Sequence, residues 1–371
     1  MAEQFATRGW LVHQVLLPET AAKLAERVRL EALWCVFKDE WKQIETMSLQ
    51  GLNPTHLLTD GKLREKWLSN PKMVWRNGNM RAPLISKSCG MVNIYTQPDV
   101  RQQILFNPTV VETLRILYAT LPEAETKETL CYALGPDRLG LKSKGATDMD
   151  RHLDSNVFLP CAEQSPRYRI QALVTLQIGT PAGKVTAADL GSIEVLQSFH
   201  LYYALAGWYF RNVGVTPFSN NGPYPFEELN KTHLPGFITW VRDYIYGTDA
   251  KPDTLKPYLE GLPKTYVEMK WVTPVVKAGE LIAFDSRLPH RNTRNKSDVD
   301  RIVSYVSLYR QADWKRMGSP PILPKFTGEQ ESQHKGSNRK NPEEREAFDS
   351  VWAERVKFAT DDALIKEVLG L

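Results

Sequence analysis

Residues 271–290 read WVTPVVKAGELIAFDSRLPH, and this stretch decides the fold. Its start, Trp271 to Val276, is rich in β-branched residues and predicts a strand, and Lys277 to Glu280 predicts a tight turn. Leu281 to Phe284 predicts a second strand, which delivers Asp285 to His290 into a loop. The stretch therefore predicts short strands joined by a turn, with a histidine at the end of the last loop.

A second strand signal follows this loop. Arg301 opens the run RIVSYVSLY, whose β-branched and aromatic residues predict a buried strand over Arg301 to Tyr309. A guanidinium at the head of an apolar strand is costly to bury without a partner. A bound carboxylate is a natural partner, because arginine offers a planar and permanently charged fork. The alternative is an internal salt bridge to an aspartate or glutamate.

Upstream, the tripeptide His152-Leu153-Asp154 places a histidine and an aspartate two positions apart. In an extended strand such side chains project to the same side, whereas a helix separates them by about 200°. The pair therefore predicts ligands on a strand or at a strand end. His290 lies far along the chain and can join them only if the fold brings the chain back to the same end of the strands. A barrel or sandwich of antiparallel strands does this.

The four residues together indicate a chemistry. Two imidazoles and one carboxylate, from His152, Asp154 and His290, can occupy one face of an octahedral iron(II) and leave the opposite positions for a cosubstrate and O₂. Arg301 then suits a dicarboxylate such as 2-oxoglutarate. A His-x-Asp pair by itself also occurs as a satisfied surface pair, and it is the distal segment that favours a metal site. The combination implies an oxygenase.

These residues resemble the phytanoyl-CoA hydroxylase-like family of the Fe(II)/2-oxoglutarate-dependent oxygenases. One match is Gly279 to His290 with the later Arg301, which is similar to the distal motif of that family. A second is Gly191 to His200, GSIEVLQSFH, and a third is the start, where Phe5 to Val12 and Leu16 to Glu19 look like an opening strand and first helix. The resemblance spans residues 5 to about 310.

The resemblance implies a mixed α+β fold. Its core would be a double-stranded β-helix of the jelly-roll or cupin type, in which two antiparallel sheets face each other between flanking helices. It also implies that His152, Asp154 and His290 hold the metal and that Arg301 binds the distal carboxylate of 2-oxoglutarate.

The chain departs from the family pattern at one position of this site. Many members carry a serine or threonine two residues after the arginine, where this chain has Val303. The hydroxyl that shares the carboxylate then has to come from elsewhere, and Tyr132 and Thr175 are the candidates. Asp154 stands where a halogenase needs a small residue, which favours oxygen transfer. His200 is expected to be structural rather than a metal ligand.

The implied reaction is oxidation of an unactivated C–H bond of a small molecule, either amino-acid-like or a specialised metabolite. The outcome would be hydroxylation, desaturation or oxidative ring closure, with Fe(II) as the metal, 2-oxoglutarate and O₂ as cosubstrates, and succinate and CO₂ as products. Two alternatives remain open: the same chemistry on a protein side chain or nucleobase, and a non-catalytic β-barrel binding protein. A zinc hydrolase is disfavoured because the chain has no His-Glu-x-x-His motif and Arg301 would go unexplained.

Composition predicts a soluble, cytoplasmic enzyme. The 371 residues are 42% hydrophobic, and 47 basic and 43 acidic residues give a net charge of +4, which suggests neither a nucleic-acid nor a membrane partner. The 4 cysteines contain no Cys-x-x-Cys and fit reduced thiols better than a disulfide framework. No secretory signal or membrane span is indicated. The sequence leaves the oligomeric state and the exact substrate open.

We expect a single oxygenase domain over residues 1–371, with a substrate-lid insertion at 201–263 and a C-terminal loop and helical extension at 311–371. The insertion is long for a connection and rich in aromatic residues, which is typical of a functional lid. Those aromatics can equally pack the insertion onto the core.

Other segments have a periodicity that predicts their structure. Pro18 to Phe37 and Val110 to Leu121 predict helices, and Ile170 to Ile178 predicts a central strand. Arg138 to Met149 carries glycine and lysine residues and predicts a loop at the mouth of the site.

Overall fold

The structure of the 371-residue chain is a computed structural model. It describes residues 1–26, 74–76, 79–81, 101–121, 130–132, 139–142, 148–158, 170–217, 224–249, 251–306 and 308–310. The extension predicted at 311–371 and the greater part of the helix predicted from Pro18 to Phe37 lie outside these ranges.

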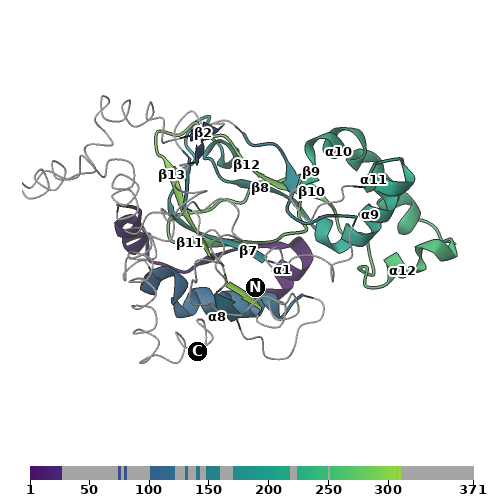
Figure 1. Cartoon of the computed structure of the whole chain (residues 1–371), viewed down its shortest axis with the longest axis horizontal. Coiled ribbons are helices and arrows are strands. Elements are labelled where there is room, and N and C mark those ends of the chain that lie inside the picture. Colours follow the sequence, from purple (N-terminus) through teal and green to yellow (C-terminus); the bar gives the residue numbers. More distant parts are fainter. Residues whose placement is uncertain are drawn as a thin grey trace, which may run out of the picture.

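Seven strands form the larger of two main sheets, and every pair in it is antiparallel (Figure 1). In spatial order they are β1 (Trp10–Gln14), β11 (Glu280–Asp285), β7 (Ile170–Gln177), β13 (Arg301–Val306), β5 (Leu139–Lys142), β3 (Asn79–Arg81) and β2 (Val74–Arg76). The predicted central strand is thus β7, which lies between β11 and β13.

Five shorter strands form the second sheet, again with antiparallel pairs throughout. Their order is β10 (Lys270–Val272), β8 (Ile193–Gln197), β12 (His290–Asn292), β6 (His152–Leu153) and β9 (Tyr224–Pro225). A separate pair joins β14 (Leu308–Arg310) to β4 (Leu130–Tyr132).

The core lies between the two main sheets. Buried side chains of the larger sheet, such as Leu173 and Val303, belong to the same apolar cluster as Leu153 and Val195 of the smaller one. Burial of this apolar area is the main favourable term that holds the two sheets together. Two facing antiparallel sheets flanked by helices confirm the predicted mixed α+β class.

Helices α1 (Ala2–Arg8) and α8 (Pro108–Tyr118) lie together beside the larger sheet, below it in Figure 1. Helix α8 begins two residues before the predicted Val110, because Pro108 fixes φ at its first turn and the Asn107 side chain accepts hydrogen bonds from the first free amides, and it ends at Tyr118. Its inward residues, Val111, Leu114 and Leu117, are buried as the periodicity predicted.

The insertion is a helical group at one end of the smaller sheet, on the right in Figure 1. It contains α9 (Tyr203–Asn212), α10 (Glu227–Thr232), α11 (Leu234–Trp240) and α12 (Lys256–Leu259), with a π-helical turn at Val241–Ile245 and a 3₁₀ turn at Asp253–Leu255. Its aromatic rings pack on one another, as in the stack of Trp208 on Trp240 with 5.6 Å between centroids. Phe210 and Phe237 of the insertion also belong to the apolar cluster that contains Leu153 and Val195 of the smaller sheet, so these aromatics pack the insertion onto the core.

Three expected elements have different bounds in the structure. The predicted opening strand begins only at Trp10, because Gly9, at φ 78°, ends helix α1 just before it. The strand predicted from Trp271 to Val276 ends at Val272. The run from Arg301 to Tyr309 divides into β13 and β14 on either side of residue 307.

The loop predicted from Arg138 to Met149 is wrong in part, because Leu139 to Lys142 form strand β5 inside the larger sheet. Gly140 lies opposite Val303, and an added Cβ there would lie 2.8 Å from the Val303 side chain. Pairing with β13 therefore makes this segment a strand, and close approach to Val303 favours glycine over a residue that local propensity would choose.

Candidate metal and carboxylate site

Two neighbouring strands of the smaller sheet bring the three predicted metal ligands together. His152 of β6 lies directly opposite His290 of β12 in the register, and Asp154 follows the end of β6. One ligand atom from each residue lies within 4.8 Å of the others. Asp154 Oδ1 is 3.8 Å from His152 Nε2, and Asp154 Oδ2 is 3.6 Å from His290 Nε2.

Each imidazole is oriented by the backbone of its own strand. His152 Nδ1 lies 3.0 Å from the carbonyl oxygen of Asp150, and His290 Nδ1 lies 3.0 Å from that of Leu288. With the proton on Nδ1, each ring donates to its carbonyl and presents the Nε2 lone pair toward Asp154. This is the tautomer that a metal-binding histidine requires.

The surroundings of His290 keep its ring neutral. Burial and then the nearby His152 lower the pKa of His290. The ring packs against Phe284, with 4.8 Å between centroids, and against His152 at 4.4 Å. A neutral imidazole held in a fixed orientation is a competent metal ligand.

Asp154 is oriented from the opposite sheet. The Gln171 amide, on β7, donates a hydrogen bond to Asp154 Oδ2 across the space between the sheets. The carboxylate thus meets Gln171 through Oδ2 and approaches His152 through Oδ1. Sequence analysis did not single out Gln171, although a glutamine inside an otherwise apolar strand is a signal that could have found it.

Arg301 lies in the interior at the head of β13, as predicted, and is only 4% exposed. Its Nη1 donates to Asn292 Oδ1 at 3.2 Å, and burial lowers its pKa. Within the described residues its Nε has no hydrogen-bond partner and no carboxylate forms a salt bridge with it. The alternative of an internal salt bridge is therefore not observed in the described part of the chain, and a buried donor is left that an anion can satisfy.

The candidate hydroxyl groups differ in position. Thr175 is buried on β7, opposite Val303 in the β7–β13 register, on the strand face that also carries Gln171. Tyr132 pairs with Leu308 in the separate two-stranded sheet, and its side chain lies outside what the structure describes. Of the two, only Thr175 is placed beside the strand of Arg301.

His200 lies apart from the metal ligands. Its Nε2 is 2.9 Å from the carbonyl oxygen of Ala6, and burial lowers its pKa to about 4. The cluster of possible ligands among the described residues contains His152, Asp154 and His290 but not His200. Its position fits the structural role predicted for it.

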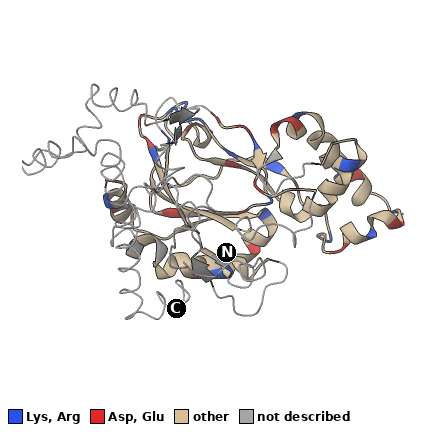
Figure 2. Cartoon of the chain, viewed as in Figure 1, with Lys and Arg blue, Asp and Glu red and all other residues tan. Residues whose placement is uncertain are grey.

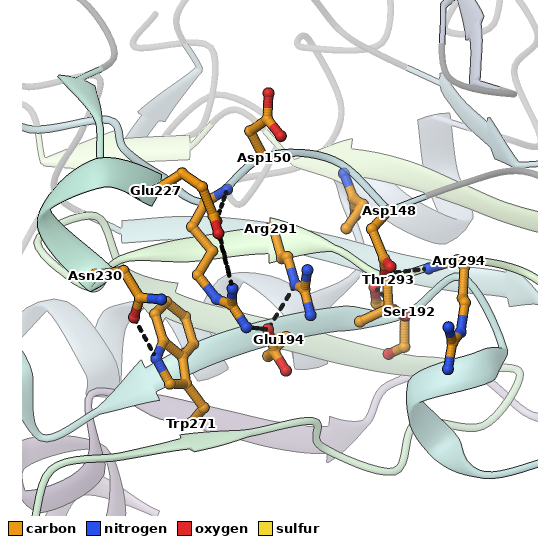
Figure 3. A network of polar contacts seen from close by, with 12 residues as sticks. Asp148, Asp150, Ser192, Glu194, Glu227, Asn230, Trp271, Arg291, Thr293 and Arg294 are labelled. Carbon is orange, nitrogen blue, oxygen red and sulfur yellow. Dashed lines mark hydrogen bonds and ion pairs between the residues drawn. The ribbon is translucent and has the colours of Figure 1, made fainter. Parts of the chain in front are cut away.

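A network of charges fixes the insertion to the strand that carries His152 (Figure 3). Arg151 donates to Glu194 of β8 at 3.1 Å and to Glu227 of α10 at 3.3 Å, and its guanidinium lies over the Trp271 ring at 4.5 Å. Arg291 of β12 donates to the same Glu194 at 2.6 Å. Glu227 of the insertion is thereby connected through Arg151 to Glu194 of β8 and Trp271 of β10, and through Glu194 to Arg291 of β12.

Backbone contacts strengthen this attachment. Strand β9 of the insertion pairs with β6, so that Pro225 lies opposite His152. The amide of Phe226 donates to the carbonyl of Arg151 at 2.9 Å. The insertion therefore adjoins the predicted metal ligand His152 directly.

The sequence matches no protein-family model and no curated protein. Among solved structures, the chain is similar to EctD from S. alaskensis with 2-oxoglutarate and 5-hydroxyectoine, at 12% identity and a TM-score of 0.37 over 84% of this chain and 76% of that one. It is similar to the epimerase SnoN in complex with Fe3+, alpha ketoglutarate and nogalamycin RO, at 12% identity and a TM-score of 0.35 over 88% and 90% of the two chains. It is also similar to the alpha ketoglutarate dependent carbocyclase SnoK from nogalamycin biosynthesis, at 14% identity and a TM-score of 0.35 over 83% and 85%.

Proposed function

We propose that this chain is an Fe(II)/2-oxoglutarate-dependent dioxygenase of the phytanoyl-CoA hydroxylase-like branch. The observation that carries the proposal is one juxtaposition inside the core. Two oriented imidazoles and a carboxylate converge within 4.8 Å, and the facing sheet carries an arginine whose buried Nε has no hydrogen-bond partner among the described residues.

The ligand set fits one iron ion. Metal–ligand bonds of about 2.1 Å allow two donors on the same ion to lie at most about 4.2 Å apart. Asp154 Oδ1 lies 3.8 Å from His152 Nε2 and Asp154 Oδ2 lies 3.6 Å from His290 Nε2, both within this reach. One ligand atom from each of the three residues lies within 4.8 Å of the others, so a small closure of the three side chains around one ion completes the set. Two histidines and one carboxylate that leave coordination positions open are the ligand set typical of iron(II) oxygenases. A zinc hydrolase would leave the buried guanidinium of Arg301 unexplained.

We assign a role to each residue of the site. His152, Asp154 and His290 hold the iron, Arg301 binds the distal carboxylate of 2-oxoglutarate, and Thr175 is the candidate hydroxyl beside it. Iron(II) with 2-oxoglutarate would supply the electrons that reduction of O₂ requires, with release of succinate and CO₂. Gln171 holds the Asp154 carboxylate in place through its hydrogen bond, and burial keeps water away from the His290 side of the site.

The substrate we propose is a small molecule, amino-acid-like or a specialised metabolite, which is hydroxylated, desaturated or cyclised. The attachment of the insertion beside His152 supports a lid that covers such a substrate. Lysine and arginine are interspersed with acidic residues over the described chain (Figure 2), which does not favour a nucleic acid. No helix among the described residues is long and apolar enough to cross a membrane.

The test is an anaerobic titration of the purified protein with iron(II) and 2-oxoglutarate, observed through the weak visible charge-transfer band of the chelate. We expect the band in wild type and in His233→Ala, since His233 lies between α10 and α11 and not among the ligands. His290→Ala and Asp154→Ala should lose iron binding. Arg301→Ala should bind iron without forming the band at moderate 2-oxoglutarate concentrations.

Three results would contradict the proposal. Iron that binds without a band in wild type removes the role of Arg301 as a cosubstrate ligand. A wild-type protein that binds no iron favours the non-catalytic binding protein. Retained conversion of 2-oxoglutarate to succinate by His290→Ala removes the ligand assignment.

A further inference from the structure

The short strand that carries His152 depends on the insertion for most of its pairing. Strand β6 is 2 residues long, and its ladder with β12 of the core contains one residue pair, His152 with His290. On its other side, both of its residues pair with β9 of the insertion. The insertion therefore contributes at least as much as the core sheet to the position of a predicted metal ligand.

Arg151, the residue before His152, is held by the insertion through both its main chain and its side chain. The Phe226 amide donates to the Arg151 carbonyl oxygen at 2.9 Å, and the Arg151 amide donates to Glu227 Oε2 at 3.4 Å. The guanidinium Nη1 donates to the same carboxylate oxygen at 3.3 Å. Phe226 is buried in the apolar core, so residues 224–232, which we call the attachment segment, are a firm support for Arg151.

The same guanidinium also contacts two strands of the core sheet (Figure 3). It donates to Glu194 of β8 at 3.1 Å and lies over the Trp271 ring of β10 at 4.5 Å. Trp271 Nε1 in turn donates to Asn230 Oδ1 of the attachment segment at 2.9 Å. The Arg151 side chain thus joins the attachment segment to the core directly beside His152, while its own partners are not metal ligands.

We infer that Arg151 is a positioning residue that couples the metal site to the insertion through Glu227. The inference rests on the proposed function and deepens it, because the insertion is the proposed substrate lid. The Arg151–Glu227 ion pair helps to hold β6 where His152 can share one ion with Asp154 and His290. By linkage, a bound ion holds the attachment segment against β6 to the same extent. Substrate that fastens the insertion would therefore tighten the iron site.

The size of this coupling follows from what remains when the ion pair is lost. Coupling between two sites typically changes affinity about 5- to 150-fold. The lower end applies to this ion pair, because the Glu227 side chain is 28% exposed and the β6–β9 ladder does not depend on it. Glu227→Gln keeps the shape of the side chain and removes its charge, so it tests the ion pair without opening a cavity.

The experiment measures zinc(II) affinity and hydrogen exchange of the full chain. Zinc(II) alone is the probe, since it binds histidine and carboxylate donors and undergoes no redox change. We expect Glu227→Gln to weaken zinc(II) binding about 5- to 10-fold. The control Glu228→Gln changes the neighbouring exposed glutamate and should bind zinc(II) as wild type does.

Hydrogen exchange measures the reverse effect of the metal on the insertion. Zinc(II) should slow exchange in peptides that cover residues 224–232 of wild type and of Glu228→Gln. The Phe226 amide reports on the contact directly, because it donates to Arg151. Most of this slowing should be lost in Glu227→Gln, and all of it in His290→Ala, which lacks a ligand.

A double-mutant cycle assigns the coupling to Arg151. Because Glu227 acts through Arg151, the double variant Arg151→Gln/Glu227→Gln should lose no more zinc(II) affinity than Arg151→Gln alone. Losses that simply add would show that Glu227 acts by another route, and they would overturn the role of Arg151.

Two further results overturn the inference and leave the proposed function standing. One is equal zinc(II) affinity in wild type and Glu227→Gln, with exchange that is faster in the variant whether or not zinc(II) is present, which shows a merely structural ion pair. The other is exchange over residues 224–232 that zinc(II) does not alter in a wild type that binds it. A wild type that binds neither zinc(II) nor iron(II) overturns both the inference and the proposed function.

Discussion

Replacement of Gly207 by alanine should destabilise the protein, although alanine is the better helix former. Gly207 lies inside α9, where the helix crosses the segment that follows Asp154. A Cβ added at Gly207 would lie 2.1 Å from the carbonyl oxygen of Val157 and 3.2 Å from its carbon. Relief of that contact requires the helix and the segment to separate by about 1 Å, since non-bonded heavy atoms rest at about 3.5 Å and tolerate only slight compression.

The net effect follows from two opposing terms. Glycine to alanine within a helix contributes about 1 kcal/mol of stability. Overpacking costs about 1–3 kcal/mol, and the upper end applies because the contact is with the backbone and no rotamer change relieves it. We therefore expect a net loss of about 2 kcal/mol in the free energy of unfolding. Val157 lies three residues after Asp154, so iron affinity should fall as well.

The assay is chemical denaturation, followed by tryptophan fluorescence and circular dichroism, with iron(II) titration of the folded protein. The control is Ala204→Gly, an exposed position of the same helix that should lose about 1 kcal/mol through propensity alone and retain iron affinity. A Gly207→Ala protein as stable as wild type, or more so, would refute the reasoning. It would mean that α9 does not press on the backbone beside the metal ligand.

Two further predictions concern groups that orient the site. Gln171→Leu removes the amide that donates to Asp154 and should lower iron(II) affinity, measured by calorimetry, about 10-fold. The denaturation midpoint should change little. Unchanged iron(II) affinity would show that Asp154 needs no support from Gln171. Glu194→Gln leaves Arg151 and Arg291 without their shared carboxylate and should cost about 2–3 kcal/mol of stability, less than for a fully buried pair because these groups are partly exposed. An equal midpoint for Glu194→Gln and wild type in denaturation would contradict that role.

The arrangement of His152, Asp154 and His290 could be predicted because each depends on local spacing. Two residues at i and i+2 share a face only in a strand, and a loop after an apolar strand brings the third residue to the sheet edge. The same holds for Arg301, since an arginine opening an apolar strand stands out in sequence. The structure brings His152, Asp154 and His290 together and places Arg301 at the head of β13. His290, however, begins strand β12 inside the smaller sheet and does not lie in the predicted loop.

Strand β5 and its Lys142 could not be predicted in this way. The segment Leu139-Gly140-Leu141-Lys142 has little intrinsic strand propensity, and glycine weakens it further. It is a strand because β13 offers an edge to pair with and Val303 leaves room only for glycine opposite. Burial of the lysine follows from that register, which connects residues far apart in the chain. Local sequence carries no signal of it.

Strand β12 connects the metal ligands to the buried basic residues. His290 faces the metal ligands and Asn292, two positions later on the same face, meets both Lys142 and Arg301. Two residues of a strand span about 7 Å. On the proposed function, a ligand held at its 2-oxo acid end by the iron must therefore carry its second anionic group several bonds away to reach Arg301. A five-carbon dicarboxylate can do so and a three-carbon 2-oxo acid cannot, so the strand repeat itself contributes to the choice of cosubstrate.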